Sequence, residues 1–220
     1  MGVPLDVKEW MKGYVGFGAT DCDAGFIQGV EEGTSFDHEV LVQIGDIDRF
    51  IAEPSHVARM DGTITCARFG GTRPFAGGTF NMLVDDANPA LKFMFYRIPF
   101  GAADGQVYTL LGHKTLHDDG ALDLWGDVTT LFVRIFAGDV QGPDMTTPAL
   151  GAKPTWPSAP IAMGTIHFQF VDGIRSARSF ASPGSSFLER ARAVEKFCGF
   201  YLRRVWALYR KYHEDASSLG

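Results

Sequence analysis

Short runs of apolar or alternating residues recur along most of the chain, and turn-forming residues separate them. The runs are rich in Phe, Tyr, Val, Ile and Thr, the residues that favour β-strands. Asp104-Gly105 is a typical hairpin turn between two of them. This close spacing predicts a mainly β fold, either an antiparallel lipocalin-like β-barrel or a strongly bent sheet. The runs lie at 14–18, 38–45, 62–69, 78–84, 91–100, 107–117, 129–136 and 164–171.

The number of runs bears on function. A closed barrel of about eight strands is wide enough inside to hold one small ligand. The chain has 18 phenylalanines, most of them in these runs, which predicts an aromatic-rich core or cavity.

Two segments interrupt the β pattern. Residues 46–55 predict a short helix that starts near Asp46, ends before Pro54 and caps one barrel end. Residues 138–164 contain five prolines and little periodicity. A stretch of this kind predicts a strap laid across the barrel, with Trp156 as its anchor.

The C-terminal part predicts a long amphipathic α-helix, 183–215, packed on a barrel domain of residues 1–182. Its apolar residues step by three and four. Ser186 and Glu189 are placed for an N-terminal capping box. Seven Lys/Arg stand against two Asp/Glu between 185 and 213. Simple packing, a peripheral membrane contact, a flavoenzyme contact and a homodimer are the alternatives for this basic helix.

Composition excludes some classes of function. The net charge of −6 gives no support to nucleic-acid binding. The three cysteines are far apart and form no CxxC pair, so the sequence predicts neither a disulfide framework nor a zinc ribbon. No secretory signal opens the chain, and no apolar run approaches ~18 residues. We therefore expect a soluble, cytoplasmic protein.

One lysine stands in a run where an apolar residue is expected. Strand alternation places Lys114 on one face with Leu110, Gly112 and Leu116. If that face points inward, the lysine must pair with an acid or lower its pKa. A salt bridge to Asp123 or Asp127 and a catalytic role are the two alternatives.

Other polar residues in the runs are candidates for a site. Arg134 shares a face with Phe132 and Phe136, where it could clamp a carboxylate or stack on an aromatic ring. The Tyr96 hydroxyl could be a polar group in an apolar pocket. His38 and His167 fall in separate runs and could meet inside the barrel as a proton-shuttling pair.

The order of residues around Lys114 is specific. A glycine, one residue and Lys114 are followed by Asp118 and by Asp-Leu-Trp at 123–125, ahead of Thr129-Thr130. With the segments 44–66, 94–100 and 110–138, this resembles an accessory domain of large glucose–methanol–choline type, cholesterol-oxidase-like flavin oxidoreductases. The resemblance implies an association with sterol-like or lipid-like chemistry. The flavin part is missing, since 13–19 lacks the G-x-G-x-x-G spacing of a dinucleotide site.

These observations predict a barrel that binds an apolar small molecule of sterol, terpenoid or fatty acyl type. The predicted ligand-binding residues are Phe93, Phe95, Phe132, Phe136, Trp125, His38 and His167. The alternative is a cofactor-independent isomerase, cyclase or hydratase that uses Lys114, Asp127, Tyr96 and Arg134. No metal and no cofactor are expected, because no ligand cluster or cofactor motif is present.

Overall fold

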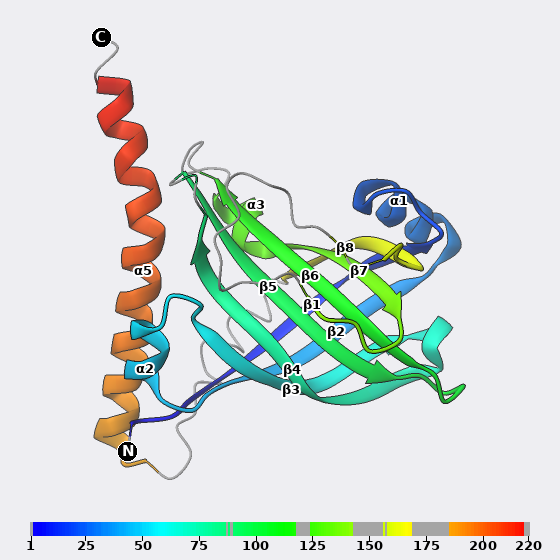
Figure 1. The fold of residues 1–220 in the computed structure, drawn as a ribbon, viewed down its shortest axis with the longest axis horizontal. Helices are drawn as coiled ribbons and strands as arrows, with labels where there is room; N and C mark the ends of the chain where they lie inside the picture. Colours follow the sequence, from blue (N-terminus) through cyan, green and yellow to red (C-terminus); the bar gives the residue numbers. More distant parts are fainter. Residues whose placement is uncertain are drawn as a thin grey trace.

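A closed antiparallel barrel of eight strands forms the body of the protein (Figure 1). The computed structural model describes residues 2–86, 88, 90–117, 124–142, 156, 158–168 and 185–217. Each strand pairs with the next, and β8 returns to pair with β1. The predicted barrel is confirmed, and the alternative of an open bent sheet is not. The strands are β1 (Leu5–Phe17), β2 (Ser35–Ile44), β3 (Val57–Cys66), β4 (Gly71–Asp85), β5 (Leu91–Gly101), β6 (Val107–His117), β7 (Thr130–Ala137) and β8 (Ala162–Phe168).

The first strand is longer than the sequence predicts. It begins at Leu5 rather than near Tyr14. Charged residues hide its pattern, because Lys8 faces solvent while Glu9 faces inward with Leu5 and Met11. An acid on the inner face breaks the alternation on which the prediction depends.

Most of the barrel interior is solid. Large side chains that are almost fully buried fill it from the centre toward the end closed by the short 3₁₀ helix η1 (Ala67–Phe69), in agreement with close packing in protein cores. At that end the Phe69 ring contacts the rings of Phe100 and Tyr108. The space that remains lies toward the opposite end of the barrel, near α3 (Leu124–Thr129) and α5 (Phe187–Ser217).

Helix α1 (Cys22–Glu32) covers the outer face of β1 and β8, and the sequence runs do not predict it (Figure 1). Asp21 caps its start by accepting from the backbone N–H of Ala24 at 2.8 Å. Two glycines allow the helix to lie close to the sheet. A Cβ on Gly25 would lie 2.1 Å from the Met163 carbonyl oxygen, and one on Gly29 would lie 2.7 Å from the backbone of Val15.

The short helix α2 (Ile47–Ala52) confirms the helix predicted between Asp46 and Pro54. Asp46 caps it by accepting from the backbone N–H groups of Asp48 and Arg49. Ile47 and Phe50 are buried in the core cluster, so α2 closes part of one barrel end.

Helix α5 packs against α2 beside the barrel, and the predicted capping box at its start is present (Figure 1). Its buried face comprises Ala193, Phe197, Phe200, Val205 and Leu208. The Phe200 ring lies 4.7 Å from the His56 ring and 5.8 Å from the Phe50 ring. Arg204 donates to the Leu83 carbonyl oxygen at 2.6 Å and pairs with Asp85, which ties the helix to β4.

Candidate functional site

A cavity of about 250 Å³ lies inside the barrel, at the end flanked by α3 and α5. Its walls are mainly apolar, and one corner is polar. Val128 of α3 and Tyr201 of α5, which line the cavity, are half-buried. The apolar walls are Phe80, Met82, Met94, Val128, Phe168 and Tyr201, and the polar lining residues are Glu9, Tyr96, Lys114 and Thr129.

The polar corner is an ion pair held by two neighbours. Lys114 Nζ lies 3.4 Å from Glu9 Oε1, and their side chains are 4% and 15% exposed. The Tyr96 hydroxyl donates to both Glu9 oxygens, at 3.2 and 3.1 Å. His38 Nε2 lies 3.8 Å from Glu9 Oε1. Four strands, β1, β2, β5 and β6, therefore each contribute one inward-facing side chain to the cluster.

Strand register places these residues at one level of the barrel. Glu9 of β1 lies opposite Val40 of β2, and His38 is the next inward position along that strand. Tyr96 of β5 lies opposite Gly112 of β6, and Lys114 is the next inward position. Because side chains of a strand alternate between the two faces, all four point to the interior.

The electrostatics keep the carboxylate charged. Burial alone would raise the pKa of Glu9, but the Lys114 ammonium, His38 and the Tyr96 hydroxyl together outweigh burial and lower this pKa to about 2. Burial, followed by the negative charge of Glu9, raises the pKa of the Tyr96 hydroxyl well above its usual value. At neutral pH the corner therefore holds a carboxylate and an intact phenol.

His38 has unused hydrogen-bonding capacity. Its side chain is fully buried, and within the described part of the chain neither ring nitrogen has a hydrogen-bond partner. The Lys114 ammonium has three donors, and among the described residues it makes one hydrogen bond, to Glu9, and one contact with the face of the Tyr96 ring, at 5.4 Å. Polar atoms in this state favour an occupant that can bond to them.

The structure brings together three of the predicted site residues, Lys114, Tyr96 and His38. The partner of Lys114 is Glu9, which the sequence does not predict. Asp123 lies outside the described residues, and Asp127 accepts a hydrogen bond from the backbone N–H of His117 at 2.8 Å. The predicted meeting of His38 with His167 is wrong, because His167 faces outward, where its ring contacts Phe26 of α1.

All four predicted ligand-binding phenylalanines lie on the outer face of the barrel rather than in its cavity, namely Phe93, Phe95, Phe132 and Phe136. The inward residues of β5 lie on the same face of the strand as Tyr96, and the inward residues of β7 are Leu131, Val133 and Ile135. Both faces of these strands are apolar, so alternation alone cannot say which one points in. The side chain of Trp125 lies outside the described residues.

Arg134 also lies on the outer face. Its guanidinium stacks on the Trp156 ring at 4.5 Å, and its Nη1 lies 3.3 Å from His113 Nδ1. Burial, with the charge of Arg134, lowers the pKa of His113 to about 4, so this imidazole is neutral and can accept from the guanidinium. The Phe136 ring stacks on Trp156 at 6.4 Å.

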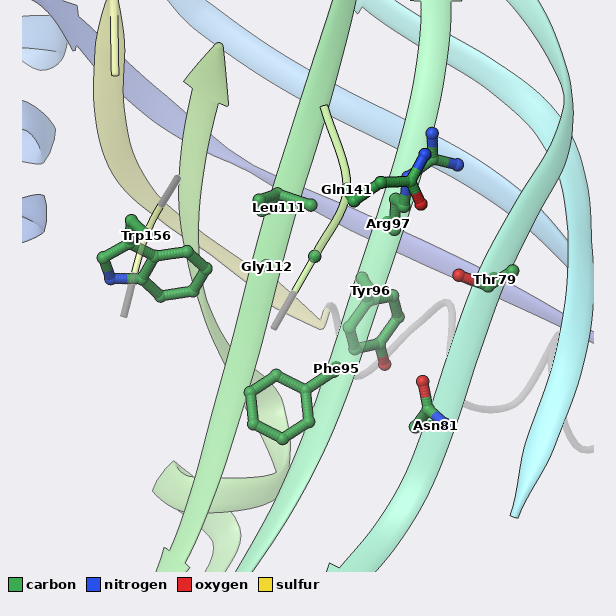
Figure 2. Close-up of a pocket in the computed structure, with 10 residues that line it drawn as sticks. Thr79, Asn81, Phe95, Tyr96, Arg97, Leu111, Gly112, Gln141 and Trp156 are labelled. Atoms are coloured by element: carbon green, nitrogen blue, oxygen red, sulfur yellow. The ribbon is translucent and has the colours of Figure 1, made fainter. Parts of the chain in front are cut away.

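A smaller pocket of about 150 Å³ lies on this outer face, over β4, β5 and β6 (Figure 2). Figure 2 shows Phe95, Leu111 and Trp156 along one side of it and Thr79 and Asn81 along the other. Arg97 donates to the Val140 carbonyl oxygen at 2.8 Å and pairs with Asp139, so its charge is already compensated. This outer pocket is the weaker candidate for a ligand site, because it is small and because Arg97 is already engaged.

Sequence reasoning predicted only Tyr96 and Lys114 among the residues that line the interior cavity. The lining residues that it missed are Glu9, Phe80, Met82, Met94, Val128, Thr129, Phe168 and Tyr201. The sequence held a signal for Met94, which shares the face of Tyr96, and for Phe80 and Phe168, which lie in predicted aromatic-rich runs.

The described residues contain no group of three or more His, Cys, Asp or Glu side chains placed to hold a metal ion. Among the helices that the structure describes, none is long and apolar enough to cross a bilayer. No family model, curated protein or solved structure matches this chain.

Proposed function

We propose that this protein binds an apolar small molecule inside the barrel. The observation that carries the proposal is the interior cavity, whose walls are mainly apolar and include a polar corner formed by Glu9, Tyr96 and Lys114. Small-molecule sites commonly combine a largely apolar lining with a few convergent polar groups. The resemblance to an accessory domain of sterol-type flavoenzymes points to the same class of ligand.

The size of the cavity limits which classes of ligand can fit. The volume of about 250 Å³ is just below the usual range of ~300–1,000 Å³ for small-molecule sites. A compact terpenoid or a short acyl chain suits this space. A sterol is larger and requires α5 or α3 to move outward, so we propose the compact classes.

Binding of a neutral fluorescent probe, N-phenyl-1-naphthylamine, tests this function. We expect saturable binding with increased fluorescence, and displacement by compact terpenoids. Met82→Trp should fill the cavity and abolish probe binding. The control Val57→Trp changes an exposed residue of β3 and should leave binding intact. No saturable binding to the wild-type protein overturns the proposal, and equal binding by Met82→Trp places the probe elsewhere.

The second candidate is a cofactor-independent isomerase, cyclase or hydratase that acts in the same cavity. It is favoured by His38, an imidazole with no hydrogen-bond partner among the described residues, 3.8 Å from the Glu9 carboxylate. The pKa values of Glu9 and Tyr96 argue against it, because acid–base catalysts work best with a pKa near the operating pH. Product analysis after incubation with candidate terpenoids tests it, and any turnover should be lost in His38→Ala.

A further inference from the structure

The polar corner of the cavity offers an occupant both donors and an acceptor. Among the described residues Lys114 makes one of its three possible hydrogen bonds, and that bond is long at 3.4 Å. The Glu9 carboxylate accepts from Tyr96 and Lys114, and a carboxylate has about four acceptor positions. Both residues line the cavity, so a ligand group placed there can meet Lys114 and Glu9 together.

The charges of the corner compensate one another. Glu9 is ionised and Lys114 is its cation, and the two side chains are 15% and 4% exposed. The other cavity residues close to them are apolar or hydroxyl-bearing. Charges interact more strongly in such a poorly solvated place than in water. A carboxylate ligand would bring a second anion beside Glu9, and an ammonium ligand would bring a second cation beside Lys114.

We propose that the cavity selects neutral ligands that carry a hydroxyl group, that is, compact aliphatic or terpenoid alcohols. This inference rests on the proposed binding function and narrows its ligand class. A hydroxyl group donates one hydrogen bond and accepts two, so it can donate to Glu9 and accept from Lys114 at the same time. A ketone or an ether can only accept, and it leaves the free acceptor positions of Glu9 unused. The hydrocarbon part of the ligand lies against Phe80, Met94 and Phe168.

The test is a series of ligands with eight carbon atoms each and different polar groups. Octanol, octanoate, octylammonium and dibutyl ether compete with N-phenyl-1-naphthylamine for the wild-type protein at pH 7. We expect octanol to bind at least about tenfold more tightly than each of the others, the scale of one hydrogen bond to a charged group. Octanoate or octylammonium binding as tightly as octanol overturns the inference, and so does ether binding as tightly as octanol.

A variant makes the charge argument sharper. Glu9→Gln removes the anion and keeps the shape, so Lys114 becomes available to a carboxylate ligand. We expect octanoate to bind the variant more tightly than octanol does. We also expect octanoate to bind the variant at least about tenfold more tightly than it binds the wild type. Glu39→Gln, on the exposed outer face of β2, is the matched control and should keep the wild-type order. An unchanged order in folded Glu9→Gln contradicts the role of Glu9.

The outcomes separate this inference from the proposed function. If the probe and all octyl ligands fail to bind the wild-type protein, the binding function itself is wrong. If they bind without regard to head group, the binding function stands and the alcohol preference is wrong. The wild-type ligand series tests the alcohol preference by itself, so this test stands even if Glu9→Gln does not fold.

Discussion

The buried pair of Glu9 and Lys114 is the most consequential contact between individual residues in this protein. Strand alternation predicts that Lys114 shares a face with Leu110, Gly112 and Leu116, and the structure shows that this face points inward. Its partner is 105 residues away in the sequence, on a strand paired with neither β5 nor β6. No local pattern links the two, so only closure of the barrel reveals the pair.

Lys114→Met should destabilise the protein. Removal of the cation leaves the Glu9 carboxylate buried without its charge partner, which typically costs about 3–5 kcal/mol. Chemical denaturation measures the loss. The double variant Lys114→Met with Glu9→Gln removes both charges and should recover much of the stability. A double variant less stable than Lys114→Met would contradict this account of the pair.

Acid should weaken the fold through Glu9. Its folded pKa, about 2, lies below the ordinary value of 4.5, so the ionised group stabilises the folded state above pH 4.5. That contribution, on the order of 3 kcal/mol, is lost as pH falls from about 4.5 to about 2. Unfolding free energies of wild type and Glu9→Gln, compared over this range, isolate it. Parallel pH profiles would show that Glu9 makes no such contribution.

At the scale of elements, the sequence predicts most strands and both α2 and α5, because their periodicity or capping residues are local signals. It does not predict α1, although Asp21 and Gly33 are suitable end residues, because Gly25 and Gly29 lower helix propensity inside it. These glycines serve close packing on β1 and β8 instead. The phenylalanines on the outer face of β5 and β7 were predicted to line the cavity for a different reason. Alternation separates the two faces of a strand, but it does not tell which face points into the barrel.

Docking of α5 depends on Phe200. This ring is 3% exposed and packs on Phe50 of α2 and on His56. Phe200→Ala should cost about 3–5 kcal/mol, as for other buried aromatic residues. Hydrogen exchange should show that α5 loses protection while the barrel strands keep theirs. Trp206→Ala, at a side chain 68% exposed, is the control. Equal protection of α5 in both variants would exclude Phe200 as its anchor.

At the scale of the whole molecule, α5 has two different sides. One side closes the barrel end, supplies Tyr201 to the cavity and uses Lys196 and Arg204 for contacts with Asp48 and Asp85. The other side leaves Leu188, Leu202 and Trp206 exposed, at spacings that place them on one helix face with Arg192 and Glu195. The same helix thus borders the ligand site and presents apolar and charged groups to the surroundings.

We propose that this outer side of α5 binds anionic lipid surfaces. Exposed Leu and Trp beside basic residues are typical of interfacial helices, and each basic contact near such a surface contributes ~1 kcal/mol.

Sedimentation with phosphatidylserine vesicles should show binding at low salt and its loss at high salt. Arg192→Gln with Arg203→Gln should weaken it by about tenfold or more. Lys12→Gln with Arg59→Gln, exposed on the barrel, is the matched control. An absence of binding at low salt would overturn the proposal.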